Sequence, residues 1–168
     1  MTILEAINEG NLENLQAAIK GGEKVNEAID ENGESALMVA IRKENKDIVQ
    51  ALLKAKADVT YQNPNNGQNA MMVACDTGFD PAIALLLKDG TPLEAADNQG
   101  QTALHIAALK GNKKIVDQLL KAKAPIDQVD NDGNDALHLA MINKVPGMHQ
   151  TFAKYNQQWN SKNKKEQT

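Results

Sequence analysis

The sequence repeats itself with a period of 33 or 34 residues, and this repetition constrains its fold more than any other feature. Four glycines, Gly33, Gly67, Gly100 and Gly133, mark the period. An Ala-Leu or Ala-Met pair follows each glycine at the same offset, and a Leu-Leu pair lies near the end of three of the units. A fixed period in this range is typical of stacked supersecondary units that each contact only their neighbours. We therefore expect one elongated domain.

Residues 97–129 show the pattern of one unit. Asp-Asn-Gln-Gly at its start is typical of a tight turn in which the glycine adopts a positive φ. Thr102 is suited to cap a helix, and the apolar residues that follow it form one stripe along that helix. Gly111 ends this first helix, and a second helix is predicted from about Lys113 to Lys121. Because neither helix would persist alone at this length, stability must come from packing between units.

This unit resembles the ankyrin repeat, whose pattern is Asp-x-x-Gly-x-Thr-Pro-Leu-His-x-Ala-Ala, then Gly, then an Ile-Val-x-x-Leu-Leu helix. Residues 97–128 match that pattern nearly position by position, with Ala103 in place of the proline, and a weaker match extends from about residue 3 to about residue 155. The resemblance implies an all-α solenoid of stacked helix-turn-helix units with short hairpin loops. The predicted domain spans 1–159, with repeats at about 1–29, 30–62, 63–96, 97–129 and 130–159, and a flexible polar tail follows at 160–168.

Several positions depart from the family pattern. Glu44 and Lys144 stand where a glycine is expected between the two helices, and Lys56 and Lys123 replace a second family glycine. A left-handed conformation at such non-glycine residues costs roughly 1 kcal/mol. Residues 63–66 include one extra residue, so we expect the third hairpin to bulge or to reach further.

The two ends of the array differ from its middle. The first unit, 1–29, is expected to form an N-terminal cap of two helices without a leading hairpin, with polar residues at positions that internal repeats bury. At the other end, a Val-Pro-Gly sequence at 145–147 interrupts the expected loop and starts a new helix that contains Phe152, Tyr155 and Trp159. We expect these aromatic side chains to cover the exposed end of the last repeat.

Composition and charge limit the classes of partner. Apolar residues make up 42% of the chain but aromatic residues only 3%, so the core must be aliphatic. The net charge is −4, and Arg42 is the only arginine. An acidic chain repels a phosphate backbone, and a chain poor in arginine lacks the side chain best suited to bidentate phosphate recognition. We therefore expect no nucleic-acid partner.

The sequence contains no segment suited to a membrane. No stretch approaches the roughly 18 consecutive apolar residues of a spanning helix, and the first residues do not form a signal peptide. We expect no membrane partner and a cytoplasmic location, with export by a route that uses no N-terminal signal peptide as the alternative. A single cysteine excludes an intramolecular disulfide.

No residue set points to catalysis, a metal or a cofactor. The chain lacks a glycine-rich phosphate loop, a zinc-binding helix motif and a nucleophile elbow. His105 and His138 share one repeat position that Met38 and Met72 fill elsewhere, so no catalytic or metal-binding set is repeated. The resemblance implies that this histidine forms hydrogen bonds between repeats. Cys75 lies in an apolar stripe and is expected to be a buried, inert thiol. We therefore expect a non-enzymatic protein without a cofactor.

The resemblance implies that a partner protein binds the concave surface formed by the hairpin tips and the solvent-facing ends of the first helices. Carried onto this sequence, the predicted partner-binding residues are Glu31, Asn32, Glu34, Arg42, Lys43, Asn65, Asn66, Gln68, Asp76, Thr77, Asn98, Gln99, Gln101, Leu109, Lys110, Asn131, Asp132, Asn134, Ile142 and Asn143. Leu109 and Ile142 should face outward one unit apart, and we expect them to form a small apolar anchor. Phe79, at an inter-helix turn, is a second exposed apolar candidate, with a turn-stabilising contact as the alternative.

The resulting interpretation is a protein-binding scaffold module that recognises another protein through its concave face. Two alternatives stay open. One is a bacterial effector or immunity-type protein that blocks one specific target. The other is a self-associating structural scaffold, which would form a dimer through the terminal aromatic helix. A monomer is otherwise expected.

Overall fold

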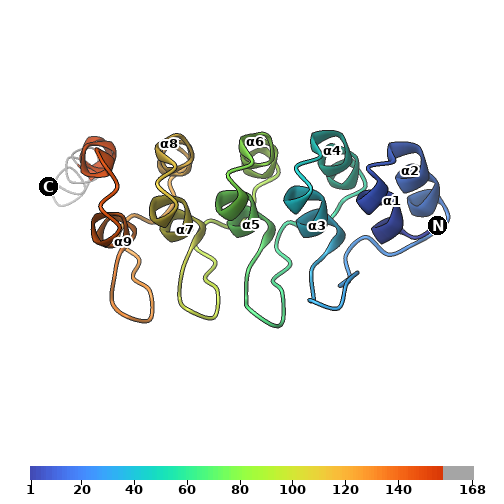
Figure 1. Ribbon diagram of the computed structural model, residues 1–168, viewed down its shortest axis with the longest axis horizontal. Helices are drawn as coiled ribbons and strands as arrows, with labels where there is room; N and C mark the ends of the chain where they lie inside the picture. The colour runs from blue at the N-terminus through green and yellow to red at the C-terminus, as the bar shows by residue number, and fades with distance from the viewer. Residues whose placement is uncertain (157–168) are drawn as a thin grey trace, which may run out of the picture.

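The computed structural model describes residues 1–156, in which the regular secondary structure is helical, with two isolated antiparallel bridges beside it. The labelled helices are α1 (Ile3–Glu9), α2 (Leu12–Lys20), α3 (Ala36–Arg42), α4 (Lys46–Lys54), α5 (Ala70–Thr77), α6 (Asp80–Lys88), α7 (Ala103–Leu109), α8 (Lys113–Lys121) and α9 (Ala136–Ile142). The helices stack in two rows, with the odd-numbered helices next to the hairpin loops and the even-numbered helices on the opposite side (Figure 1). The predicted all-α solenoid is confirmed.

Polar caps determine where the helices begin. Thr102 occupies the N-cap of α7, and α8 spans Lys113–Lys121, both as the sequence predicts. The side chains that accept a backbone N–H at the start of the other inner-row helices are Thr2, Ser35, Asn69 and Asp135. Three outer-row helices begin at an asparagine that accepts an N–H in the same way: Asn11, Asn45 and Asn112. These caps accept hydrogen bonds from backbone N–H groups that have no partner within the first turn of a short helix.

Small residues allow the inner-row helices to pack closely. One alanine per unit lies at the same repeat position and is fully buried: Ala6, Ala40, Ala74, Ala107 and Ala140. The outer-row helices add a leucine or isoleucine stripe, such as Ile115 and Leu119 of α8. The core is therefore a continuous aliphatic layer between the two rows.

The predicted strained turns are present. Glu44, Lys56, Lys123 and Lys144 all have φ between 54° and 66°. The hairpin of the third repeat also contains the predicted extra residue. The N–H of its glycine, Gly67, donates to the carbonyl four residues earlier, whereas the glycines of the other hairpins donate to the carbonyl three residues earlier.

The first unit is a pair of helices without a preceding hairpin, as expected. The last unit differs from the expectation. Residues 148–156 are helical, but Phe152 is buried in the core and the Tyr155 hydroxyl donates a 2.6 Å hydrogen bond to Asp117 of α8. These two aromatic side chains therefore pack back against the stack and do not cover its end. The reason is the repeat register, because 148–156 takes the outer-row place of the last unit. Trp159 lies outside the described residues.

Within the described part of the chain, no helix is both long enough and apolar enough to cross a membrane.

Candidate functional site

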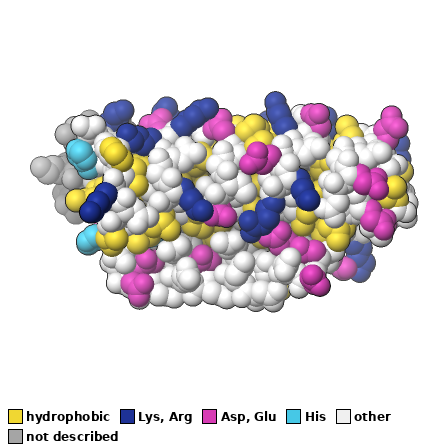
Figure 2. All heavy atoms as spheres, in the orientation of Figure 1, with side chains coloured by type: hydrophobic (Ala, Val, Ile, Leu, Met, Phe, Trp, Pro, Cys, Tyr) yellow, Lys and Arg dark blue, Asp and Glu magenta, His cyan; other side chains and the backbone are white. Residues whose placement is uncertain are grey.

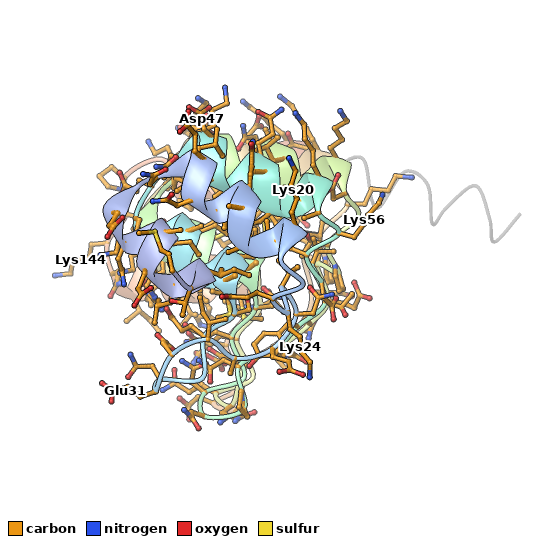
Figure 3. The ribbon with its side chains drawn as sticks, turned by 90° about the vertical axis from the view of Figure 1, so that its right-hand side faces the viewer. Lys20, Lys24, Glu31, Asp47, Lys56 and Lys144 are labelled. Carbon is orange, nitrogen blue, oxygen red and sulfur yellow. The ribbon has the colours of Figure 1, made fainter. Side chains whose placement is uncertain are left out.

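The predicted partner-binding residues lie along one side of the stack. Viewed along the stack, Glu31 at a hairpin tip and Lys144 at the end of the inner row lie on one side, and Lys56 lies on the opposite side (Figure 3). In the space-filling view, acidic side chains are frequent near the hairpin edge, and lysines gather over the helices (Figure 2). We define the concave face as the surface between the hairpin tips and the C-terminal ends of the inner-row helices.

A chain of ion pairs crosses the N-terminal half of this face. The Arg42 guanidinium lies 2.5 Å from the Glu34 carboxylate and 3.7 Å from that of Asp76. Lys110 lies 2.7 Å from the same Asp76. The prediction that Glu34 faces solvent is wrong: Glu34 is buried, because its carboxylate turns inward to Arg42. These ion pairs link the second, third and fourth units.

The hairpin tips are linked by a ladder of asparagine side chains. The Nδ2 atom of Asn65 donates to the Asn32 carbonyl at 2.8 Å, Asn98 donates to the Asn65 carbonyl at 3.1 Å, and Asn131 donates to the Asn98 carbonyl at 3.0 Å. The backbone N–H groups of Asn98 and Asn131 also donate to the preceding hairpin. The side-chain amides of these predicted contact residues therefore hold the tips in line.

One aspartate organises the last hairpin. The Oδ1 atom of Asp130 accepts N–H bonds from Asp132 at 3.0 Å and from Asn134 at 2.9 Å. Burial by itself raises the pKa of Asp130, but the hydrogen bonds from Asn134 and Asp132 outweigh it, and the pKa falls below its ordinary value. The carboxylate is thus the form that the fold stabilises.

In the C-terminal half of the concave face, one repeat position carries apolar side chains. Leu109 and Ile142 stand at the repeat position that Arg42 and Asp76 occupy in earlier units. Ile142 is 61% exposed, as expected of an outward-facing side chain, whereas Leu109 is half-buried, which corrects the expectation for that residue. The Asn143 side chain donates to the Leu109 carbonyl, at the end of α7, at 3.2 Å.

A hollow of about 670 Å³ lies at the N-terminal end of the concave face. Its lining includes Leu4 and Asn8 of α1, Glu31 and Asn32 of the first hairpin, and Arg42.

The remaining predicted residues divide by exposure. Those exposed are Lys43, Asn66, Gln99 and Asp132, and those half-buried are Gln68, Thr77, Gln101 and Asn134. Exposure alone does not test partner binding, so the partner-binding role of each residue stays a prediction.

Phe79 and Cys75 are buried to different degrees. Phe79 is half-buried and packs against the core at the N-cap of α6, so it supports the turn. Cys75 is fully buried. Burial, with a smaller contribution from the Asp76 charge, raises the pKa of the thiol, which disfavours the reactive thiolate.

The two histidines of the shared repeat position differ. His105 is buried, and its ring contacts Thr102 and the Asn134 carbonyl of the next unit. His138 is exposed because no unit follows α9 among the described residues. The structural role implied for this position thus holds for His105. Residues 1–156 contain no group of three or more His, Cys, Asp or Glu side chains that is arranged to hold a metal ion.

Sequence reasoning missed two exposed apolar residues. Met141, in the last unit, is 62% exposed, and Val129, at the end of the fourth unit, is 53% exposed. The repeat position of Met141 could have predicted its exposure. The corresponding residues of earlier units are buried because the following unit covers them.

Comparison with known proteins agrees with this architecture. A family model described as "Ankyrin repeats (3 copies)" matches residues 3–97 and 90–163. A search of curated proteins finds no match.

Proposed function

Because the chain belongs to the ankyrin-repeat family, whose repeats are generally protein–protein interaction modules, we propose that it binds a partner protein through its concave face and carries out no catalysis. The alternation of short helices and hairpins supports this role, because it offers an extended surface. The partner would lie along the hairpin tips and the inner-helix ends.

The observation that carries the proposal is the change in chemistry along one repeat position. In the second and third units this position holds Arg42 and Asp76, which pair with each other and with neighbouring charges. In the last two units it holds Leu109 and Ile142, and Ile142 is 61% exposed. Apolar side chains gain free energy when a partner removes them from water, whereas paired surface charges gain little. The position of Leu109 and Ile142 is therefore the expected centre of the interface.

The rigidity of the hairpin tips also favours binding. The Asn65, Asn98 and Asn131 amides connect successive tips by hydrogen bonds. A surface already ordered before association loses less conformational entropy when a partner binds. The tips thus provide a pre-formed rim beside the apolar centre.

The test is affinity capture with three forms of the protein. Wild type is compared with Ile142→Glu and with the double variant Leu109→Glu/Ile142→Glu, after urea unfolding has shown that each is folded. The matched control is Gln16→Glu/Gln50→Glu, which adds the same charge to exposed positions of α2 and α4. Any captured protein is then purified and titrated against all forms.

A partner that binds wild type and the control but loses at least tenfold in affinity for both Ile142 variants supports the proposal. Equal affinity for all forms would overturn the apolar centre, and equal loss in the control would show a general charge effect. Several partners would fit a scaffold module, whereas one foreign target would fit the effector or immunity alternative.

The self-association alternative has its own measurement. Phe152 is buried and Tyr155 is bonded to Asp117, so neither side chain is free to form the expected dimer contact. We expect a monomer in sedimentation. A dimer that persists in the absence of any partner would favour the structural scaffold over partner binding.

A further inference from the structure

Two hollows flank α4 on the outer row of the stack. One, of about 540 Å³, lies between α4, the loop that follows it and the C-terminal part of α6. The other, of about 350 Å³, lies between α2 and α4. Gln50 and Lys54 line both hollows, so the two are neighbours on either side of the same helix. We call this pair of hollows the outer grooves.

The outer grooves are partly lined by apolar side chains. Val59 and Leu85 line the larger groove, and Leu12 and Ile19 line the smaller one. All four are half-buried side chains that pack against the core and leave part of their surface open. An apolar side chain of a bound segment would therefore gain free energy by entering either groove.

A row of lysines crosses the outer grooves. Lys20, Lys54 and Lys88 are the last residues of α2, α4 and α6, share one repeat position, and are exposed at the grooves. We define these three residues as the lysine row. Within residues 1–156 they take part in no ion pair, whereas Lys121, the next residue in register, is held by Asp117 at 2.7 Å. The charges of the lysine row are thus available to an anionic partner.

A fourth lysine extends the positive charge of the larger groove. Lys56 lines this groove and adopts a left-handed φ of 63°, at a position where the third unit has Gly90. Figure 3 shows Lys20 and Lys56 on the side of the stack away from Lys144. The outer grooves and the concave face are therefore separate surfaces.

Two aspartates also line the larger groove. The Oδ1 atom of Asp58 already accepts hydrogen bonds from the backbone N–H of Thr60 at 2.8 Å and from its hydroxyl at 2.7 Å. Asp89 is exposed at the C-cap of α6, beside Lys88. Three lysines face these two carboxylates, so the lining of the larger groove keeps a positive excess.

The spacing of the lysine row selects the backbone of a partner. Neighbouring packed helices lie about 8–10 Å apart. A polyproline II segment has three residues per turn and rises about 3.1 Å per residue, so every third side chain lies on one face at about 9 Å intervals. In a β-strand the third side chain points to the opposite face, and an α-helix about 10–12 Å wide would rest on the helix ridges without entering the grooves.

We propose that the outer grooves bind an acidic polyproline II segment of a partner protein, with a carboxylate at every third residue facing the lysine row and apolar side chains between them in the grooves. A peptide fits better than a nucleic acid, because the grooves are partly apolar and the chain carries a net charge of −4. This surface is distinct from the concave face, so either proposal can fail without the other.

The experiment measures binding of two labelled peptides by fluorescence anisotropy at low salt. The spaced peptide is Glu-Leu-Pro-Glu-Leu-Pro-Glu, and the clustered peptide, Glu-Glu-Glu-Leu-Pro-Leu-Pro, has the same composition and charge. We expect the spaced peptide to bind at least about threefold more tightly, and added salt to weaken its binding because exposed ion pairs are screened.

Charge reversal in Lys54→Glu/Lys88→Glu should weaken binding of the spaced peptide at least about tenfold. The matched control is Lys46→Glu/Lys113→Glu, which reverses two exposed lysines at the N-terminal ends of α4 and α8 and should leave the affinity within about twofold. Urea midpoints check that each variant is folded. Because a glutamate at a helix C-terminus is unfavourable, Lys54→Gln/Lys88→Gln is the second test and should also weaken binding.

A dissociation constant above about 1 mM for the spaced peptide would overturn the proposal. Equal affinity for the two peptides, or an equal loss in the control variant, would show attraction by overall charge and overturn it as well. An oligothymidylate of the same charge that binds more tightly than the spaced peptide would assign the lysine row to nucleic acid, against the proposal.

Discussion

The Nε2 atom of His105 lies 3.1 Å from the carbonyl oxygen of Asn134, so a buried imidazole on α7 bridges its own unit to the next hairpin. The Nδ1 atom of the same ring lies 3.2 Å from the backbone nitrogen of Thr102, which can only donate. The ring proton therefore belongs on Nε2, which donates to Asn134. One side chain thus caps a helix and joins two repeats.

His105→Ala should lower the free energy of unfolding by about 1–3 kcal/mol, because the Thr102 N–H and the Asn134 carbonyl both lose their partner. The matched control is His138→Ala, at the same repeat position but exposed, which should change stability by less than about 0.5 kcal/mol. Urea unfolding followed by circular dichroism measures both. Similar losses for the two variants would contradict the bridging role.

Gly100→Ala should be more destabilising than Gly133→Ala by about 1–3 kcal/mol. The two glycines have nearly the same φ, 76° and 81°. Both variants therefore lose the same free energy of unfolding by placing an alanine in the left-handed conformation. Only at Gly100 would the added Cβ approach Asn131, at 2.5 Å from its side chain and 2.8 Å from its backbone nitrogen. The difference between the two unfolding free energies therefore isolates the contact between hairpins, and a difference near zero would show that the hairpins shift freely.

Lys56→Gly should stabilise the protein by up to about 1 kcal/mol, because Lys56 adopts a left-handed φ of 63° that costs a lysine more than a glycine. Gln50→Gly, at an exposed position inside α4, is the control and should destabilise by about 1 kcal/mol. Thermal and urea unfolding of both variants give the comparison. Destabilisation by Lys56→Gly would mean that glycine's extra freedom in the unfolded chain outweighs the relieved strain.

Acid should destabilise the protein partly through Asp130. Because its pKa is lower in the folded state, the unfolded chain binds this proton first as the pH falls. The contribution of Asp130 is thus complete above its unfolded pKa of about 4 and is lost as the pH falls through the folded value. The free energy of unfolding, measured by urea at pH 6 and at decreasing pH, should decline less steeply in Asp130→Asn than in wild type. A wild-type slope in Asp130→Asn would contradict the assignment.

Much of the fold follows from local patterns. The period, the turn glycines and the Thr102 cap predict α7 and α8 correctly, and the family pattern locates the left-handed lysines. These features depend on backbone conformation and on apolar spacing, which are encoded within one unit. The candidate site was less predictable. The inward turn of Glu34 toward Arg42 depends on how the hairpin meets the end of α3 in the same unit, and the half-burial of Leu109 could not be read from its repeat position alone.

By itself, the sequence determined the solenoid, because each amphipathic unit can bury its stripe only against a neighbour with the same pattern. Only the tertiary structure decided which of the repeated positions remain available. Arg42 and Ile142 share one position, yet the first is held in ion pairs and the second is open to solvent. Ala108 and Met141 share another, and a following unit covers only the first. Exposure is a property of the neighbours of a residue, and in a stacked fold those neighbours lie about one repeat away in the sequence.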